Sequence, residues 1–283
     1  FHKQMAKKLG AKGWLSRPWP KEYGGHDAPL IEQFIFSEVL RYHKGAGFDA
    51  LGVGVLAPTL LVSGTDEQKR EHLPPMARGE QFWCQLWSEP NAGSDLANLQ
   101  LKADLQGDYF ILNGQKTWQS AAHRADYGLV YCRTDPNAPK HRGISIFIVD
   151  MKTPGITTRK LDTMFDHTLY EVFFDDAKVH KSCVVGQLNQ GWYYITQALD
   201  HERVFMAATI AGYQRIFDEI VEYAKATKHN GKPISKDPII QQKLTEMAIE
   251  LHVGRLLGYR LAWLLRAQLQ ASSRRKPCRS RRQ

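Results

Sequence analysis

The densest group of polar, turn-forming residues in this 283-residue chain lies at residues 85–96. Pro90 fixes the backbone after a short apolar run, and Asn91, Gly93 and Ser94, which follow it, favour a sharp turn. Such a turn presents backbone N–H groups and hydroxyls that suit the polar ring edge or the carbonyl of a bound ligand. An ordinary tight turn beside a buried tryptophan explains the same spacing equally well.

A second group lies in the segment that begins at Gly114, where Trp118 and Ser120 occupy alternate positions of an expected strand. Side chains at alternate positions point to the same face of a sheet. An aromatic plane beside a hydroxyl can therefore cover one face of a flat cofactor. A cross-strand tryptophan in the core of a barrel is the alternative, and taken alone it fits the segment better.

The third group is Asp200-His201-Glu202-Arg203, in the first turns of a long helix. Glu202 can serve as a general base if its pocket is apolar, because burial raises the pKa of a carboxyl group toward the working pH. An intrahelical ion pair or a solvated face is the alternative. The eleven histidines show no HExxH or similar spacing, so we expect no metal site.

The periodicity of the chain changes twice. Residues 1 to 80 have helical spacing, best seen in Ile31–Leu40 and in Asp66–Leu73, where Thr65 is expected to cap the helix. A second helical part contains a long helix over Ile239–Leu269 and, before it, another helix with one apolar face. The residues on that face are Ile210, Tyr213, Phe217, Ile220 and Ala224.

Between the helical parts, segments rich in β-branched and aromatic residues predict strands at Tyr127–Arg133, Gly143–Asp150 and Leu169–Phe174. Tyr109–Ser120 is predicted to be a β-hairpin that turns at Asn113-Gly114. Strands at this spacing, without helices between them, favour an antiparallel barrel or sandwich. Because the order is helical, β, helical and no GxGxxG or GxxxxGK[ST] loop is present, the sequence excludes a doubly wound nucleotide fold.

Composition is that of a globular protein. With 43% hydrophobic and 24% charged residues, the chain is neither a disordered chain nor a small scaffold. Four widely spaced cysteines without a CxxC pair favour a reducing compartment over a disulfide framework or a cysteine zinc site. No apolar run approaches the roughly 18 residues that a membrane span needs. The net charge of +9 is concentrated in residues 270–283, which we expect to be a disordered tail and not a nucleic-acid surface.

In this order and spacing the three groups resemble the acyl-CoA dehydrogenase family. The resemblance rests on Trp87-Ser88-Glu89-Pro90-Asn91-Ala92-Gly93-Ser94-Asp95, on Asn113-Gly114-Gln115-Lys116-Thr117-Trp118 and on Asp200-His201-Glu202-Arg203, with support from Trp19–Gly25 and Val172–Asp176. It implies an α+β fold with a helical N-terminal domain at 1–80, a middle antiparallel β-barrel at 81–187, an incomplete helical C-terminal domain at 188–269, and the tail at 270–283.

The resemblance also implies an enzyme with FAD as its cofactor. The reaction is α,β-dehydrogenation of an acyl-CoA thioester, in which a carboxylate takes the α-proton and the β-hydrogen leaves as hydride. Carried over by motif, the cofactor-binding residues are Gln85, Trp87, Ser88, Gly93, Ser94, Trp118 and Ser120. The substrate-binding residues are Ser94, Asp200 and Arg203, and Glu202 stands where some members place the catalytic base.

The same resemblance implies partners and a location. The expected partners are the acyl-CoA substrate, an electron-transfer flavoprotein as acceptor, and further subunits in a homo- or hetero-oligomer, either a dimer or a tetramer. The expected location is the bacterial cytoplasm, or the mitochondrial matrix if the source is eukaryotic. No nucleic acid is expected.

The sequence departs from the family pattern in three places. The family continues for about a hundred further residues, which hold the usual catalytic glutamate, so the chain is expected to be truncated at its C-terminus. Thr227 stands where the family often has an arginine that reaches the FAD pyrophosphate, and Ser120 stands where threonine is usual. The alternatives are an acyl-CoA oxidase or flavin monooxygenase on the same fold, or a non-catalytic subunit or truncated product.

Overall fold

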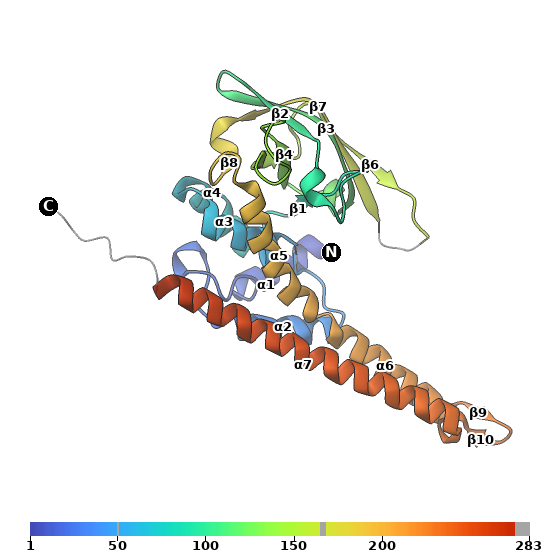
Figure 1. Ribbon diagram of the computed structural model, residues 1–283. Coiled ribbons are helices and arrows are strands. Elements are labelled where there is room, and N and C mark those ends of the chain that lie inside the picture. The colour runs from blue at the N-terminus through green and yellow to red at the C-terminus, as the bar shows by residue number, and fades with distance from the viewer. Residues whose placement is uncertain (50, 165–167, 275–283) are drawn as a thin grey trace. The chain divides into compact units, whose positions relative to one another are not determined.

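The computed structural model describes residues 1–49, 51–164 and 168–274, with side chains described as far as Ala267 (Figure 1). The chain divides into two compact units. The first comprises Phe1–Ser16, Pro20–Gly25 and Gly47–Leu199, and the second comprises Arg17–Trp19, His26–Ala46 and Asp200–Gln283.

The first unit contains helices at both ends of its sequence. They are α1 (His2–Ala11), a π-helical turn (Gly52–Leu56), α3 (Ala57–Ser63), α4 (Asp66–Ala77) and the beginning of α5 (Gly191–Ala207).

Helix α4 begins as the sequence predicts. The Thr65 hydroxyl accepts the N–H of Gln68 at 3.2 Å, and the Gln68 side chain accepts the N–H of Thr65 at 3.1 Å, which forms a capping box. Although proline often ends a helix, α4 continues through Pro74 and Pro75 to Ala77.

The sheet of the first unit has eight strands. Their bounds are β1 (Trp83–Leu86), β2 (Lys102–Gln106), β3 (Tyr109–Ser120), β4 (Tyr127–Arg133), β5 (Ile144–Asp150), β6 (Ile156–Leu161), β7 (Leu169–His180) and β8 (Val184–Val185). The order is β6-β7-β3-β2-β4-β5-β8, with β1 added to β4 in parallel. Central strands β4 and β5 are buried along nearly their whole length, which explains their continuous apolar sequence.

The α+β class is therefore confirmed, and each of the predicted strands between Tyr127 and Phe174 is present. The ladder of described strands is an open path from β6 to β8, however, and it includes the parallel pairs β1–β4 and β2–β4. A closed, wholly antiparallel barrel is thus not what this ladder forms.

The predicted hairpin at Asn113-Gly114 is wrong, because β3 runs straight through it. The pairing of β3 with β7 shifts register between Leu112 and Gly114, and the Asn113 side chain bridges the gap by two 2.9 Å hydrogen bonds to Asp176. Gly114 has φ +141°, and a Cβ there would lie 3.0 Å from the Cα of Leu101. The pair thus marks a β-bulge. The hairpin turn lies earlier, at Gly107, between Gln106 and Tyr109.

The second unit is helical. It contains α2 (Leu30–Tyr42), the end of α5, α6 (Ile210–Ala226) and α7 (Pro238–Arg274), with β9 (Lys228–His229) and β10 (Lys232–Pro233) as a short hairpin between α6 and α7. Figure 1 shows α6 and α7 side by side, joined by this hairpin. The core of the unit is formed by Phe34, Val204, Ala208, Ala262 and Leu265.

Part of α7 carries exposed apolar side chains. Between Val253 and Trp263 the most exposed are Val253, Leu256, Leu257 and Trp263, the last with 65% of its surface accessible. Of the expected tail at 270–283, residues as far as Arg274 belong to α7, and the remainder lies outside the described residues. No helix in the described part of the chain has the length and hydropathy needed to cross a membrane.

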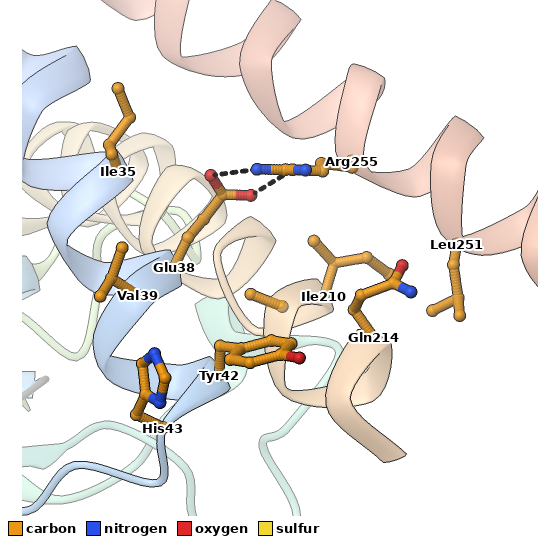
Figure 2. A pocket seen from close by; sticks show the side chains of 10 residues that line it. Ile35, Glu38, Val39, Tyr42, His43, Ile210, Gln214, Leu251 and Arg255 are labelled. Carbon is orange, nitrogen blue, oxygen red and sulfur yellow. Dashed lines mark hydrogen bonds and ion pairs between the residues drawn. The ribbon is translucent and has the colours of Figure 1, made fainter. Parts of the chain in front are cut away.

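Helices α2, α6 and α7 line a pocket of about 220 Å³ (Figure 2). One end is polar: the buried Glu38 carboxylate accepts hydrogen bonds from Arg255 at 3.0 Å and from the Tyr259 hydroxyl at 2.7 Å. Ile35, Val39, Ile210 and Leu251 form apolar parts of its wall, beside the polar side chains of Tyr42, His43 and Gln214.

Candidate functional site

Strand β1 leads directly into the turn predicted from the sequence. The N–H of Glu89 donates to the Ala92 carbonyl at 2.9 Å, and the N–H of Ala92 donates back at 3.1 Å, so the chain reverses within four residues. Gly93 and Ser94 follow and are exposed. Within β1 itself, Gln85 is half-buried and pairs with Leu129 of β4.

Trp118 lies near the end of β3 in an unusual backbone conformation. Its φ is +63°, and the β3–β7 register shifts between Lys116 and Gln119. The left-handed region is uncommon for a bulky residue, so the surrounding contacts must hold it there. The side chain is 60% exposed, so Trp118 is not the core tryptophan that its sequence position alone favoured. Ser120 ends the strand, half-buried and paired with Leu169.

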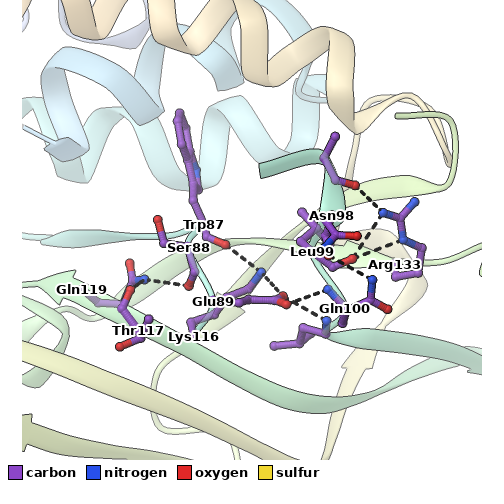
Figure 3. Close-up of polar contacts among 12 residues, drawn as sticks. Trp87, Ser88, Glu89, Asn98, Leu99, Gln100, Lys116, Thr117, Gln119 and Arg133 are labelled. Atoms are coloured by element: carbon purple, nitrogen blue, oxygen red, sulfur yellow. Dashed lines mark hydrogen bonds and ion pairs between the residues drawn. The ribbon is translucent and has the colours of Figure 1, made fainter. Parts of the chain in front are cut away.

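The two predicted groups lie against each other. The N–H of Thr117 donates to the Ser88 carbonyl at 2.9 Å, and the Gln119 side chain donates to the same oxygen at 3.4 Å (Figure 3). The turn after β1 and the end of β3 are therefore joined through backbone atoms, one residue away from Trp118. This contact places the Ser88 turn directly beside the tryptophan segment.

A buried ion pair lies beneath this contact. The Lys116 ammonium has no solvent exposure and donates to Glu89 Oε1 at 2.8 Å and to the Trp87 carbonyl at 2.9 Å. Burial lowers the pKa of Lys116, an effect that the neighbouring Glu89 carboxylate opposes. The carboxylate of Glu89 also accepts the N–H groups of Gln100 at 2.6 Å and Leu101 at 2.9 Å.

Arg133, at the end of β4, holds the neighbouring loop. Its guanidinium donates to the carbonyls of Ala97 at 2.7 Å and Leu99 at 3.2 Å, as Figure 3 shows for Leu99. The sequence reasoning gave no role to Lys116, Glu89 or Arg133. Lys116 itself was a sequence signal, because a lysine that points inward from a strand needs a buried acceptor.

The residues around the turn fit a flat ligand with a polar edge. Trp87 is 5% exposed, and its indole Nε1 has no hydrogen-bond partner among the residues that the structure describes. A buried N–H without a partner is unfavourable unless a ligand or water completes it. Gly93 has no positive φ, and no described heavy atom lies within 4 Å of a Cβ built there. Neither backbone strain nor packing requires this glycine, whereas close approach of a ligand would.

The third predicted group belongs to α5 in the second unit. Asp200 and Arg203 form an ion pair of 2.7 Å between side chains that are about half exposed, which is the intrahelical pair considered from the sequence. Glu202 is half-buried on the same helix. Burial lowers the pKa of the neighbouring His201, which favours its neutral form.

Thr227 directly follows α6 as its C-cap, and both of its backbone groups form hydrogen bonds. Its N–H donates to the Tyr223 carbonyl at 2.9 Å, and its carbonyl accepts the N–H of Ile234 at 2.9 Å. The hairpin that follows turns at Asn230 and Gly231, both of which have positive φ.

Family models match successive parts of the chain. The acyl-CoA dehydrogenase N-terminal domain matches residues 1–80, the middle domain residues 84–177 and the C-terminal domain residues 189–277.

Individual relatives agree with these matches. Acyl-CoA dehydrogenase FadE26 of Mycobacterium tuberculosis is 36% identical over 267 residues, which cover 92% of this chain and 66% of that protein. The solved Tcur3481-Tcur3483 steroid ACAD has a TM-score of 0.88 and 34% identity, and the alignment covers 94% of this chain and 68% of that one. The ChsE4-ChsE5 complex from Mycobacterium tuberculosis has a TM-score of 0.84 and 36% identity, covering 93% and 68%.

The chain thus spans just under two thirds of FadE26. The order of the three matched domains, and the identity shared along nearly the whole chain, agree with the motifs at Ser88, Trp118 and Glu202. This chain belongs to the acyl-CoA dehydrogenase family.

Proposed function

We propose that this chain carries flavin- and substrate-binding machinery of an acyl-CoA dehydrogenase, and that the protein oxidises the α,β carbon–carbon bond of an acyl-CoA thioester. The observation that carries the proposal is the 2.9 Å hydrogen bond from Thr117 to Ser88, which joins the turn to the segment that exposes the Trp118 indole. The buried Trp87 indole N–H, which has no partner among the described residues, and the exposed Trp118 ring suit the edge and one face of the FAD that the family uses.

When bound, FAD supplies the acceptor for the hydride that leaves the β-carbon. In the proposed site, the Trp87 indole N–H, the Ser88 hydroxyl and the Gln85 side chain would hold the polar edge of the ring. Trp118 and Ser120 would shield it from water. Gly93 and Ser94 allow the ring and the thioester to approach the backbone closely.

The remaining chemistry is a proton transfer. The Glu202 carboxylate takes the α-proton, while N–H donors at the thioester oxygen stabilise the negative charge that develops there. Asp200 and Arg203 bind the acyl-CoA, and their ion pair fixes the direction of the Arg203 guanidinium.

The same proposal extends to the architecture and the partners. We assign the N-terminal, middle and C-terminal domains of the family to 1–80, 81–187 and 188–269. An electron-transfer flavoprotein is the proposed acceptor. A hetero-oligomer is the proposed assembly, since two of the similar solved structures pair two different chains. A bacterial cytoplasmic location is proposed because FadE26 and the ChsE4-ChsE5 complex are bacterial.

Flavin binding by the purified chain is the experiment that tests this function. FAD added to the 283-residue chain should show a resolved visible spectrum, and an anaerobic series of acyl-CoA thioesters should bleach it. Rapid peroxide formation in air without another acceptor would instead identify an oxidase. A chain that folds but neither binds FAD nor binds acyl-CoA would contradict the proposal.

A further inference from the structure

The buried Lys116–Glu89 pair is adjacent in sequence to both halves of the candidate site. Glu89 follows Ser88 directly, and Lys116 precedes Trp118 by two residues. The Nζ–Oε1 distance is 2.8 Å, Lys116 is fully buried, and the Glu89 side chain is 7% exposed. Neither side chain is accessible to a ligand of ordinary size, so any effect on the site must pass through the backbone.

The hydrogen bonds of the pair reach the backbone at three places. Lys116 donates to the Trp87 carbonyl, and Glu89 accepts the N–H groups of Gln100 and Leu101. The turn after β1, the two residues before β2 and the second half of β3 are therefore held together by this one ion pair. Loss of either charge would leave the other buried without a counter-ion and would free at least one of these backbone groups.

A buried pair of this kind contributes little net stability, because the desolvation of both charges offsets their attraction. Its effect is to fix the positions of the backbone segments that it joins. Trp118 depends on these fixed positions, since its positive φ and the register shift beside it persist only where neighbouring contacts impose them. Lys116 fixes the strand before the bulge, and the Gln119 amide fixes it after the bulge through the Ser88 carbonyl.

We propose that Lys116 and Glu89 are positioning residues, which set the separation between the Ser88 turn and the Trp118 indole and so shape the slot for the flavin ring. This inference rests on the proposed function for the identity of the ligand. It concerns neither a contact with FAD nor the stability of the fold, and those two roles are what the experiment must separate.

The test uses the full chain with an apolar pair in place of the charged one. The double variant Lys116→Met/Glu89→Leu keeps the volume and removes both charges, so no buried charge is left without a counter-ion. The N–H groups of Gln100 and Leu101 lose their acceptor, so the thermal midpoint should fall, but the chain should stay folded at room temperature, where binding is measured. Its Kd for FAD should nevertheless rise roughly ten- to a hundredfold, the range that the loss of outer-shell partners produces at metal sites, and the visible spectrum of the bound flavin should change. The matched control is Glu38→Leu/Arg255→Met, which removes a second ion pair with a buried carboxylate.

Hydrogen exchange gives a readout that needs no flavin. In the double variant, segments 85–101 and 114–120 should exchange faster, while β4 and β5 should exchange at their original rate. In the control variant, segments 85–101 and 114–120 should also exchange at their original rate. An unchanged Kd and spectrum, or unchanged exchange, would overturn the inference. If the unmodified chain binds no FAD, the proposed function fails, and exchange alone then decides the positioning role. Should the double variant not fold, Glu89→Gln, which retains an acceptor oxygen, is judged by the same readouts.

Discussion

Gly93 and Gly107 are both exposed glycines with open space where a Cβ would stand, but only Gly107 has a backbone that disfavours other residues. Gly107 has φ +62° in the β2–β3 turn, whereas Gly93 has no positive φ. Alanine at Gly107 must therefore strain the turn, and alanine at Gly93 must not. The two positions separate a structural requirement for glycine from a functional one.

Gly93→Ala should leave the free energy of unfolding within about 0.5 kcal/mol of its original value, because nothing in the fold resists the methyl group. Its affinity for FAD or acyl-CoA should fall. Gly107→Ala should do the reverse, with a loss of about 1–2 kcal/mol of stability and unchanged ligand affinity. Urea unfolding and ligand titration measure both quantities, and equal ligand affinity in the two variants would remove the argument for Gly93.

Glu202→Gln tests the proposed base. The substitution keeps the size of the side chain and removes the proton acceptor, so the rate of flavin bleaching by acyl-CoA should fall roughly a hundredfold or more. The flavin spectrum should remain. Glu219→Gln on α6, where the exposed carboxylate pairs with Arg215, is the control. A bleaching rate that Glu202→Gln leaves intact would assign the base to another carboxylate.

At the scale of elements, Asp49 connects the π-helical turn to the sheet. Its carboxylate accepts the N–H of Gly52 at 3.3 Å and the N–H of Trp83, the first residue of β1, at 3.1 Å. Burial raises the pKa of Asp49 from 3.8 to about 6 and outweighs these two hydrogen bonds; Arg124 lowers it and Asp126 raises it to a smaller extent.

The folded chain therefore binds this proton more tightly than the unfolded chain does. The stabilisation is fully present below about pH 3.8 and is lost as the pH rises through about 6. Asp49→Asn abolishes the titration, so its unfolding free energy should decline less between pH 4 and 6, by about 1–2 kcal/mol. Urea unfolding at steps of pH measures this difference, and parallel curves for the two proteins would contradict the assignment.

The two Asn-Gly pairs show what sequence can and cannot reveal about such elements. Asn113-Gly114 and Asn230-Gly231 have the same letters, yet only the second forms a two-residue hairpin with both φ values positive. The first lies inside a strand that pairs with β2 through the turn at Gly107 and with β7, whose Asp176 is 63 positions away, and this pairing overrides the local preference. The cap at Thr65 was predictable because both of its hydrogen bonds are to Gln68, three residues later.

The same distinction holds for the candidate site. Residue types and order predicted the Ser88 turn and the tryptophan segment, and the hydrogen bond between Thr117 and Ser88 shows that they meet. The exposure of Trp118 was not predictable, because it depends on a bulge that forms only when β3 pairs with β7. The identity of the buried acceptor of Lys116 could not be predicted from the sequence either, since Glu89 lies 27 positions away.

At the scale of the whole molecule, each compact unit has its own core. Phe34 is buried in the helical unit, and Leu112 is buried in the sheet of the other. Removing either side chain leaves a cavity that neighbouring groups fill only partly, so Phe34→Ala and Leu112→Ala should each cost about 3–5 kcal/mol.

If each unit opens as its own cooperative structure, the faster hydrogen exchange of Phe34→Ala should be confined to α2, α6 and α7. In Leu112→Ala it should be confined to the strands of the sheet. Mass spectrometry of peptides resolves the two patterns, and a uniform increase across the chain in either variant would show a single cooperative unit instead.

The exposed apolar side chains of α7 bear on how this chain behaves in a test tube. The apolar surface exposed there is larger than that of isolated surface residues, and it is contributed by Val253, Leu256, Leu257 and Trp263. Self-association of folded chains, more than unfolding, should then limit the concentration at which the purified protein can be used. Its sedimentation coefficient should climb on concentrating the sample, and a mild non-ionic detergent should reverse the rise.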